Sequence, residues 1–349
     1  MGKGRRIDRL LGGKQWLLVA RLLAIAATVP AHAQTATHLR IGVQFGLGYL
    51  PFHVASQASF IEKRVSEQGL TPVAISFVHV TGSPQINDGL LSGNIEIGSG
   101  GYTAMMVFCD RTKASGDAQL LGVTALSNVP YDLYTVDPNL KSLKDLDRDK
   151  HKIGLPAVKV SVPAVYLQMA AEQIYGVGKH NEFDALTVSL AQPDGAMSLL
   201  SGGGAVNSYT FAPPFSNQVK ADAKIHKVWS SNEMFGSPAT ALSSWTTVKF
   251  RRENPKLYAA VIAAMKDSME LIAKNPKRAA EIYLKAEKSK LSVEFITEVL
   301  ANKAELRYTL APEQSAKLAD FLHRIGSLKT KPDSWKDFFF PELHNEQGN

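Results

Sequence analysis

The sequence has almost no cysteine. Cys109 is the only one among 349 residues, so no intramolecular disulfide can form. It does not follow the N-terminal apolar region, where a lipid anchor would need a cysteine. Its neighbours at 105–108 are apolar, which favours a buried, inert thiol over a nucleophile.

Motifs for common catalytic and cofactor chemistry are also missing. Residues 176–179 read Gly-Val-Gly-Lys but lack the earlier glycine of a phosphate-binding Walker loop, and 98–100 do not form a Gly-x-Ser-x-Gly turn. The nine histidines are scattered, with neither a His-Glu-x-x-His motif nor a cysteine pair. We therefore expect no catalytic residues, no metal and no cofactor, and a protein that is not an enzyme.

Charge is unevenly distributed along the chain. The formal net charge is +7, but six of the 39 basic residues and one of the 32 acidic residues lie within positions 1–21. A short apolar run at 22–29 and Ala-His-Ala at 31–33 follow. This pattern predicts a secretory signal peptide cleaved after Ala33, because the apolar run is too short to span a bilayer. An anchor helix interrupted by Arg21 is the alternative, and Arg5 and Arg6 leave twin-arginine export open.

Removal of residues 1–33 leaves 33 basic and 31 acidic residues, a net charge of +2. A nearly neutral chain gives little reason to expect nucleic acid as a partner. We therefore expect an exported, soluble, periplasmic protein.

Strand and helix patterns alternate in the remaining chain. Residues 39–43 alternate apolar and polar side chains, as a strand does, and a glycine-rich loop at 45–49 follows. A helix is expected next, with Pro51 in its first turn and Gly69 as its end, and then a strand at 75–80. This order predicts an α/β fold.

Segments 75–102 and 186–209 repeat the same order of features. Each begins with a strand, passes through a short proline-opened helix to Leu-Leu-Ser-Gly, and continues into a second strand. Residues 152–155 also echo the first strand at 40–43. The ordered set predicts two lobes of like topology.

The expected crossings between the lobes are residues 127–131 and 235–239. Lobe 1 would then comprise 34–127 and 237–349, and lobe 2 would comprise 128–236. The C-terminal part is helical in pattern and is expected to pack against lobe 1. Its helices should start near Asn254, Asn275, Ser292 and Ala311, the last one ending at Gly326.

Two loops at strand ends combine small and hydroxyl-bearing residues where a helix should begin, at 99–102 and 159–161. First-turn N–H groups of a helix lack intrahelical partners and carry partial positive charge, so such turns can hold an anion without a basic side chain. Ser99 and Ser161 could equally be ordinary helix caps. Their equivalent placement in both lobes favours binding.

The residues in this order resemble the substrate-binding proteins of the nitrate, sulfonate and taurine class of ABC importers. The likeness runs from about Leu39 to Tyr283 and comprises Leu-Arg-Ile-Gly at 39–42, Gly-x-Pro-Gln at 82–85, Leu-x-x-Gly-x-x-x-x-Gly at 90–98, Lys-Ser-Leu-Lys-Asp-Leu at 141–146 and Phe-x-x-x-Asn-Pro at 250–255. The resemblance implies a type II periplasmic binding protein fold, in which two α/β lobes close on a small solute in the cleft between them. It also implies two partners, a permease in the inner membrane and its cytoplasmic ATPase.

The sequence departs from the family pattern at two places expected beside the pocket. Residues 204–208 lack the usual Asp-Ala pair, and 211–215 replace Trp-x-Pro by Phe-Ala-Pro-Pro-Phe. The resemblance therefore does not predict which solute this chain binds. The family also has a thiamine-pyrimidine branch, whose synthases carry a cysteine-rich motif that a chain with only Cys109 cannot supply.

The resemblance and the position at strand ends together nominate the ligand-binding residues. Serines and backbone amides would hold an anionic head such as sulfonate, nitrate or carboxylate. Tyr49, Tyr102 and Phe211 would cover an apolar tail, unless they pack in the core. The full set is Phe45, Leu47, Tyr49, Ser99, Gly100, Gly101, Tyr102, Ser127, Asn128, Lys159, Val160, Ser161, Phe211 and Pro213.

Two other functions fit the same scaffold. An enzyme or binding protein for a pyrimidine or thiamine precursor would need acid/base groups, and only His53, His79 and Glu96 lie near expected strand ends. A periplasmic sensor subunit would bind solute on behalf of a membrane kinase.

Overall fold

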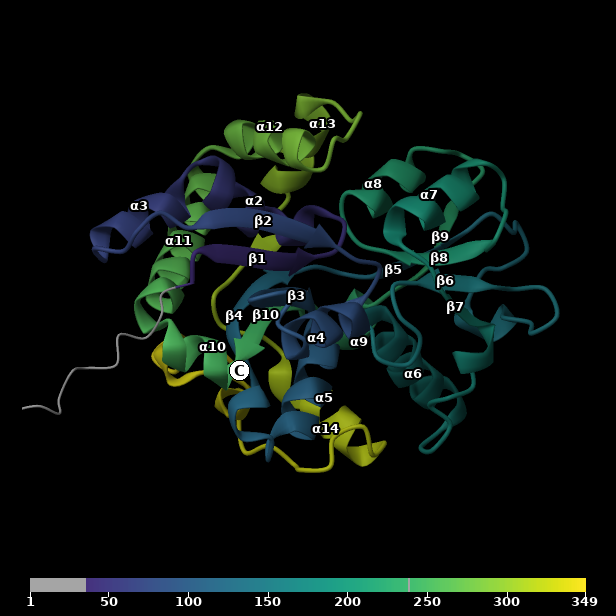
Figure 1. Cartoon of the computed structure of the whole chain (residues 1–349). Coiled ribbons are helices and arrows are strands. Elements are labelled where there is room, and N and C mark those ends of the chain that lie inside the picture. The colour runs from purple at the N-terminus through teal and green to yellow at the C-terminus, as the bar shows by residue number, and fades with distance from the viewer. Residues whose placement is uncertain (1–35, 238) are drawn as a thin grey trace, which may run out of the picture. The chain divides into compact units, whose positions relative to one another are not determined.

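Two mixed β-sheets organise the chain in the computed structural model, which describes residues 36–237 and 239–349 (Figure 1). The expected signal peptide lies outside the described residues. In spatial order the first sheet consists of β2 (Ala74–His79), β1 (His38–Val43), β3 (Ile97–Gly101), β10 (Thr240–Thr247), β4 (Leu120–Asn128) and β11 (Arg307–Tyr308). The second consists of β7 (Thr187–Ser189), β6 (Ile153–Leu155), β8 (Ser208–Phe211), β5 (Asp132–Thr135) and β9 (His226–Ser230). We call each sheet with its helices a lobe, numbered 1 and 2.

The two sheets have equivalent topology, which confirms the expectation drawn from the internal repeat. In lobe 1, β1 lies parallel to β2 and β3, and β10 is antiparallel to β3. In lobe 2, β6 lies parallel to β7 and β8, and β5 is antiparallel to β8. The chain passes between the sheets after β4 and again before β10.

Helices make the crossovers that parallel strands require. In lobe 1 they are α2 (Leu50–Gln57), α3 (Phe60–Glu67), α4 (Ser83–Leu91) and α5 (Tyr102–Thr112). In lobe 2 they are α6 (Val162–Tyr175), α7 (Gln192–Leu200) and α8 (Phe215–Lys220), and α9 (Asn232–Phe235) leads from β9 back toward β10. The single helix expected from Pro51 to Gly69 is wrong, because Ser59 adopts a left-handed φ of 56° and separates α2 from α3.

The C-terminal helices pack against lobe 1, as expected. They are α10 (Val248–Glu253), α11 (Pro255–Lys274), α12 (Pro276–Ala286), α13 (Val293–Ala301) and α14 (Ser315–Arg324). Helix α11 contacts α2 and α3, α12 contacts α2, and α14 contacts α5. Helix α14 begins four residues later than the sequence predicts, at Ser315, because Gln314 before it has a φ of 61°. Within residues 36–237 and 239–349, no helix has both the length and the apolar composition needed to cross a bilayer.

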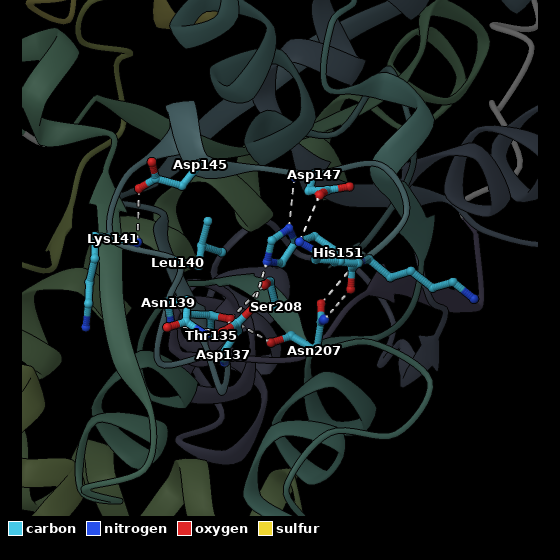
Figure 2. Close-up of polar contacts among 12 residues, drawn as sticks. Thr135, Asp137, Asn139, Leu140, Lys141, Asp145, Asp147, His151, Asn207 and Ser208 are labelled. Atoms are coloured by element: carbon cyan, nitrogen blue, oxygen red, sulfur yellow. Dashed lines mark hydrogen bonds and ion pairs between the residues drawn. The ribbon is translucent and has the colours of Figure 1, made fainter.

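Polar side chains fix the N-terminal ends of β6 and β8 in lobe 2 (Figure 2). The ring of buried His151 accepts a hydrogen bond at Nδ1 from the Asp147 N–H (2.9 Å), so its Nε2 donates to Asp137 Oδ2 (3.1 Å). Asn207 Oδ1 accepts from the Lys152 N–H (3.0 Å), and its Nδ2 donates to the carbonyl oxygen of Lys150 (2.7 Å). One of the two departures from the family pattern therefore lies where β8 begins, at the opposite end of the strand from α8.

We expect Asn207→Ala to lower the free energy of unfolding by about 1–2 kcal/mol, because the variant loses two hydrogen bonds to backbone groups. Urea denaturation measures the loss, with exposed Asn181→Ala as the matched control. Unchanged stability together with altered solute binding would contradict a purely structural role for Asn207.

Candidate functional site

The two lobes touch where the parallel strands end and their helices begin. The Leu47 N–H donates to the carbonyl oxygen of Pro213 (3.2 Å), and Gln192 Nε2 donates to that of Phe45 (3.3 Å). Thr103 Oγ1 donates to the carbonyl oxygen of Val160 (2.9 Å). We call the zone around these three contacts the interlobe seam. In open α/β sheets, ligands bind at this carboxyl edge of the strands.

Four helices start at the interlobe seam without a side-chain cap, namely α4, α5, α6 and α7. The residues preceding α4, α5 and α7 are Gly82, Gly101 and Ala191, which have no side-chain oxygen to offer. Proline stands second in α4, α6 and α7, so each of these first turns has one donor fewer and a fixed φ. The remaining first-turn N–H groups and the helix dipoles favour negative charge here.

Close backbone approach places these helix starts against the opposite lobe. A Cβ atom on Gly82 would lie 2.8 Å from the carbonyl oxygen of Pro156 in lobe 2. A Cβ atom on Gly101 would lie 3.3 Å from Val162 Cγ2 and 3.5 Å from the Val162 nitrogen, the first residue of α6. Glycine at both positions therefore lets helix starts of the two lobes face each other.

The hydroxyl groups of the two serines predicted to bind an anion are engaged in the fold. Ser99 lies within β3, not at a helix start, and its Oγ donates to the carbonyl oxygen of Gly42 (2.7 Å). Ser161 precedes α6 but does not cap it, since its Oγ donates to the carbonyl oxygen of Ala157 (2.6 Å). Lys159, two residues before Ser161, is exposed and has a left-handed φ of 66°.

Unpaired polar atoms lie at the end of β4, where the chain leaves lobe 1. Ser127 Oγ and Asn128 Nδ2 are buried without a hydrogen-bond partner among the described residues, although Asn128 Oδ1 accepts from Thr240 Oγ1 (2.8 Å). A Cβ atom on Gly48 would lie 2.8 Å from Ser127 Oγ, so the hydroxyl faces the loop after β1. An unpaired buried polar group costs about 1–3 kcal/mol, which a ligand contact could recover.

The three aromatic residues expected to cover a ligand tail pack in the cores of the lobes. The Tyr102 hydroxyl forms a hydrogen bond with Ser315 in α14. Phe211 stacks on Tyr209 at 4.3 Å within lobe 2. Tyr49 is fully enclosed, and burial raises its pKa well above the ordinary value. These placements match the core packing that the sequence left open as the alternative.

The structure brings part of the predicted set to the interlobe seam, namely Phe45, Leu47, Gly101, Val160 and Pro213, whereas Gly100 packs against Ser83, Gln44 and Trp245 of its own lobe. Sequence reasoning missed Gln44, Ser83, Thr103 and Gln192. Ser83 Oγ accepts from the Gly101 N–H (3.1 Å) and from Gln44 Nε2 (3.3 Å), and Gln192 Oε1 accepts from the Ala212 N–H (3.0 Å). Ser83 and Gln192 are the first residues of α4 and α7, the two helices of the internal repeat, and each directly precedes a proline, so the repeat itself carried the signal.

We expect Ser99→Ala to cost about 1 kcal/mol or more in the free energy of unfolding, because it removes a buried hydrogen bond. Ser127→Ala is the matched variant and should cost little, because its hydroxyl has no partner among the described residues. Urea denaturation of both proteins without added solute tests the difference. Equal losses would mean that Ser127 has a structural partner.

Comparison of the sequence with protein-family models and with curated protein sequences gave no match. Solved structures do match. The alkanesulfonate-binding protein SsuA from Xanthomonas axonopodis pv. citri, bound to MOPS, aligns with a TM-score of 0.63 and 16% identity over 85% of this chain and 96% of its own.

Two further structures match similarly. The periplasmic aliphatic sulphonate binding protein SsuA from Escherichia coli has a TM-score of 0.60 and 19% identity, covering 87% of this chain and 99% of its own. The periplasmic nitrate-binding protein NrtA from Synechocystis PCC 6803 has a TM-score of 0.65 and 14% identity, covering 86% and 84%. The chain therefore has the fold of the type II periplasmic binding proteins, with two α/β lobes, as the resemblance in its sequence implied.

Proposed function

We propose that this chain is a periplasmic solute-binding protein of an ABC importer and that it captures a small organic or inorganic anion at the interlobe seam. The observation that carries the proposal is the meeting of four helix starts from both lobes, none with a side-chain cap. Such starts offer N–H donors and partial positive charge to an anion. The named seam contacts are made by backbone groups and neutral side chains, which suits binding and release more than proton transfer.

Sulfonate and nitrate are the anions that the comparisons favour. The matched structures include proteins named for alkanesulfonate, aliphatic sulphonate and nitrate binding. A sulfonate or nitrate group has three acceptor oxygens that N–H groups from different helices can share. The unpaired Ser127 Oγ and Asn128 Nδ2 add donors at the end of β4.

Capture by closure of the lobes follows from where the chain crosses between them. Residues 129–131 join β4 to β5, and 231–239 lead from β9 back to β10. The proposed hinge lies in these two crossings, close to the lobe boundaries 34–127, 128–236 and 237–349 that the sequence predicts, with Asn128 still paired in the first sheet. The same proposal includes cleavage after Ala33, a periplasmic location, and delivery of the solute to a permease with its cytoplasmic ATPase.

Taurine, ethanesulfonate or nitrate should raise the thermal midpoint of the purified protein. A solute at 100 times its Kd adds about 2.7 kcal/mol of apparent stability. Differential scanning fluorimetry measures the shift, and ethanolamine, which lacks the sulfonate of taurine, is the matched control compound. No shift with any sulfonate, nitrate or carboxylate would contradict the proposed solute class.

Gly101→Val should abolish the solute-induced shift but leave the midpoint of the solute-free protein nearly unchanged. The added methyl groups would meet Val162 at the start of α6 and keep the lobes apart. Gly101→Ala is the graded control, because its Cβ atom needs only a small displacement of Val162. A full shift in the valine variant would exclude this part of the seam from the solute site.

Affinity for the solute should depend weakly on ionic strength, because the only charged residue in the predicted set, Lys159, is exposed. We expect less than about a threefold change in Kd between low salt and ~0.5 M sodium chloride, since dipoles in a closed site are poorly screened. Isothermal titration at both salt concentrations measures it, with Lys159→Ala as a companion expected to bind normally. A collapse of affinity in high salt would indicate ion pairing instead.

A further inference from the structure

Three side chains that are distant in the sequence converge on one point in lobe 1. His53 belongs to α2, His79 is the last residue of β2, and Glu287 follows α12 directly (Figure 1). Glu287 Oε1 lies 2.8 Å from His53 Nε2 and 3.4 Å from His79 Nε2. One ligand atom from each residue lies within 4.8 Å of the other two. We call these residues the His-Glu cluster.

The cluster holds a carboxylate that is nearly removed from water. The side chains of His53, Glu287 and His79 are 1%, 7% and 33% exposed. Among the described residues, only these histidines lie within ion-pair distance of the carboxylate. Buried carboxylates in proteins are usually paired or bound to a metal.

The spacing of the ligand atoms suits a tetrahedral ion. Zinc bonds of about 2.0–2.1 Å to imidazole and carboxylate place neighbouring ligand atoms about 3.3–3.5 Å apart. The distance between His79 Nε2 and Glu287 Oε1 is already in this range. The distance between His53 Nε2 and Glu287 Oε1 would have to increase by about half an ångström, and a small rotation of either side chain can provide this.

A fourth position is open toward a cavity. Glu287, Tyr283 and Phe45 line a space of about 540 Å³ whose other side is formed by Pro193 and Phe215 of lobe 2. The ring of His79, which is 33% exposed, lies 5.4 Å from that of Phe45, one of the residues that line this space. Two histidines, one glutamate and an open position form a recognised zinc ligand set.

We propose that His53, His79 and Glu287 bind a divalent transition metal ion such as Zn²⁺, on the lobe 1 side of a cavity that borders the interlobe seam. The metal would neutralise the buried carboxylate and join α2, β2 and α12. It would keep one position for water or another small ligand from the cavity.

Only moderate affinity is expected, because His53 Nδ1 is buried without a hydrogen-bond partner among the described residues. When Nε2 binds a metal, Nδ1 carries the proton, and an acceptor for it ordinarily orients the ring. Absence of such an outer partner typically weakens metal binding by about 10–100-fold.

Titration of the tag-free protein with Co²⁺ and then Zn²⁺ tests the proposal. Bound Co²⁺ should give the visible absorption bands of a tetrahedral site, and Zn²⁺ should displace it. His79→Ala should weaken both metals by at least roughly 100-fold, since loss of an outer partner alone already costs up to that much. The matched control, His323→Ala in α14, removes a half-buried histidine outside the cluster and should bind both metals normally.

His79→Cys keeps a metal ligand and adds a spectroscopic signature. A thiolate on Co²⁺ should give a charge-transfer band in the near ultraviolet that the original protein lacks. The natural Cys109 is buried, and burial keeps its thiol protonated, so it should not contribute. Failure of the original protein to bind either metal, or equal affinity in His79→Ala, would overturn the proposal.

Discussion

Unpaired N–H groups at helix starts constrain how the two lobes can meet. Each lobe orients its parallel strands so that their helices begin at one edge, and the two edges face each other across the interlobe seam. Acidic side chains would satisfy these groups within each lobe and remove the reason for an external anion. The residues before α4, α5 and α7 are instead glycine or alanine, and Asp194 in the first turn of α7 makes no capping hydrogen bond, so the donors stay available.

The hydroxyl groups of the three serines predicted to bind solute are of two kinds. Those of Ser99 and Ser161 hold backbone carbonyl groups of their own lobe and shape the strand end and the helix entry. That of Ser127 has no partner among the described residues and lies at a crossing between the lobes. A serine that the sequence suggests as a ligand-binding residue can therefore instead stabilise the fold. Only its hydrogen-bond partners in the structure distinguish a binding role from a structural one.

The sequence predicts the fold far better than the site. Strand alternation and the repeated Leu-Leu-Ser-Gly elements report local periodicity, so they predict two like lobes, which the sheet order confirms. The direction of a side chain depends on packing across the chain, which is why Tyr102 and Phe211 were open to two interpretations and lie in cores. His79 and Glu287 are 208 residues apart, and no spacing rule connects them. The absence of a metal motif in the sequence therefore could not bear on a ligand set assembled from three separate elements.

The position of β10 has a consequence for how the chain acquires its structure. This strand lies between β3 and β4 in the middle of the first sheet, although it follows all of lobe 2 in the sequence. The strands of lobe 2 come from one continuous stretch, so that lobe can form from local contacts. The first sheet is therefore incomplete until the residues of lobe 2 have been synthesised and the chain has come back to lobe 1 to add β10. Completion of the first-synthesised lobe thus waits for the second, and a delay between the two would leave the inner edges of β3 and β4 open to other chains.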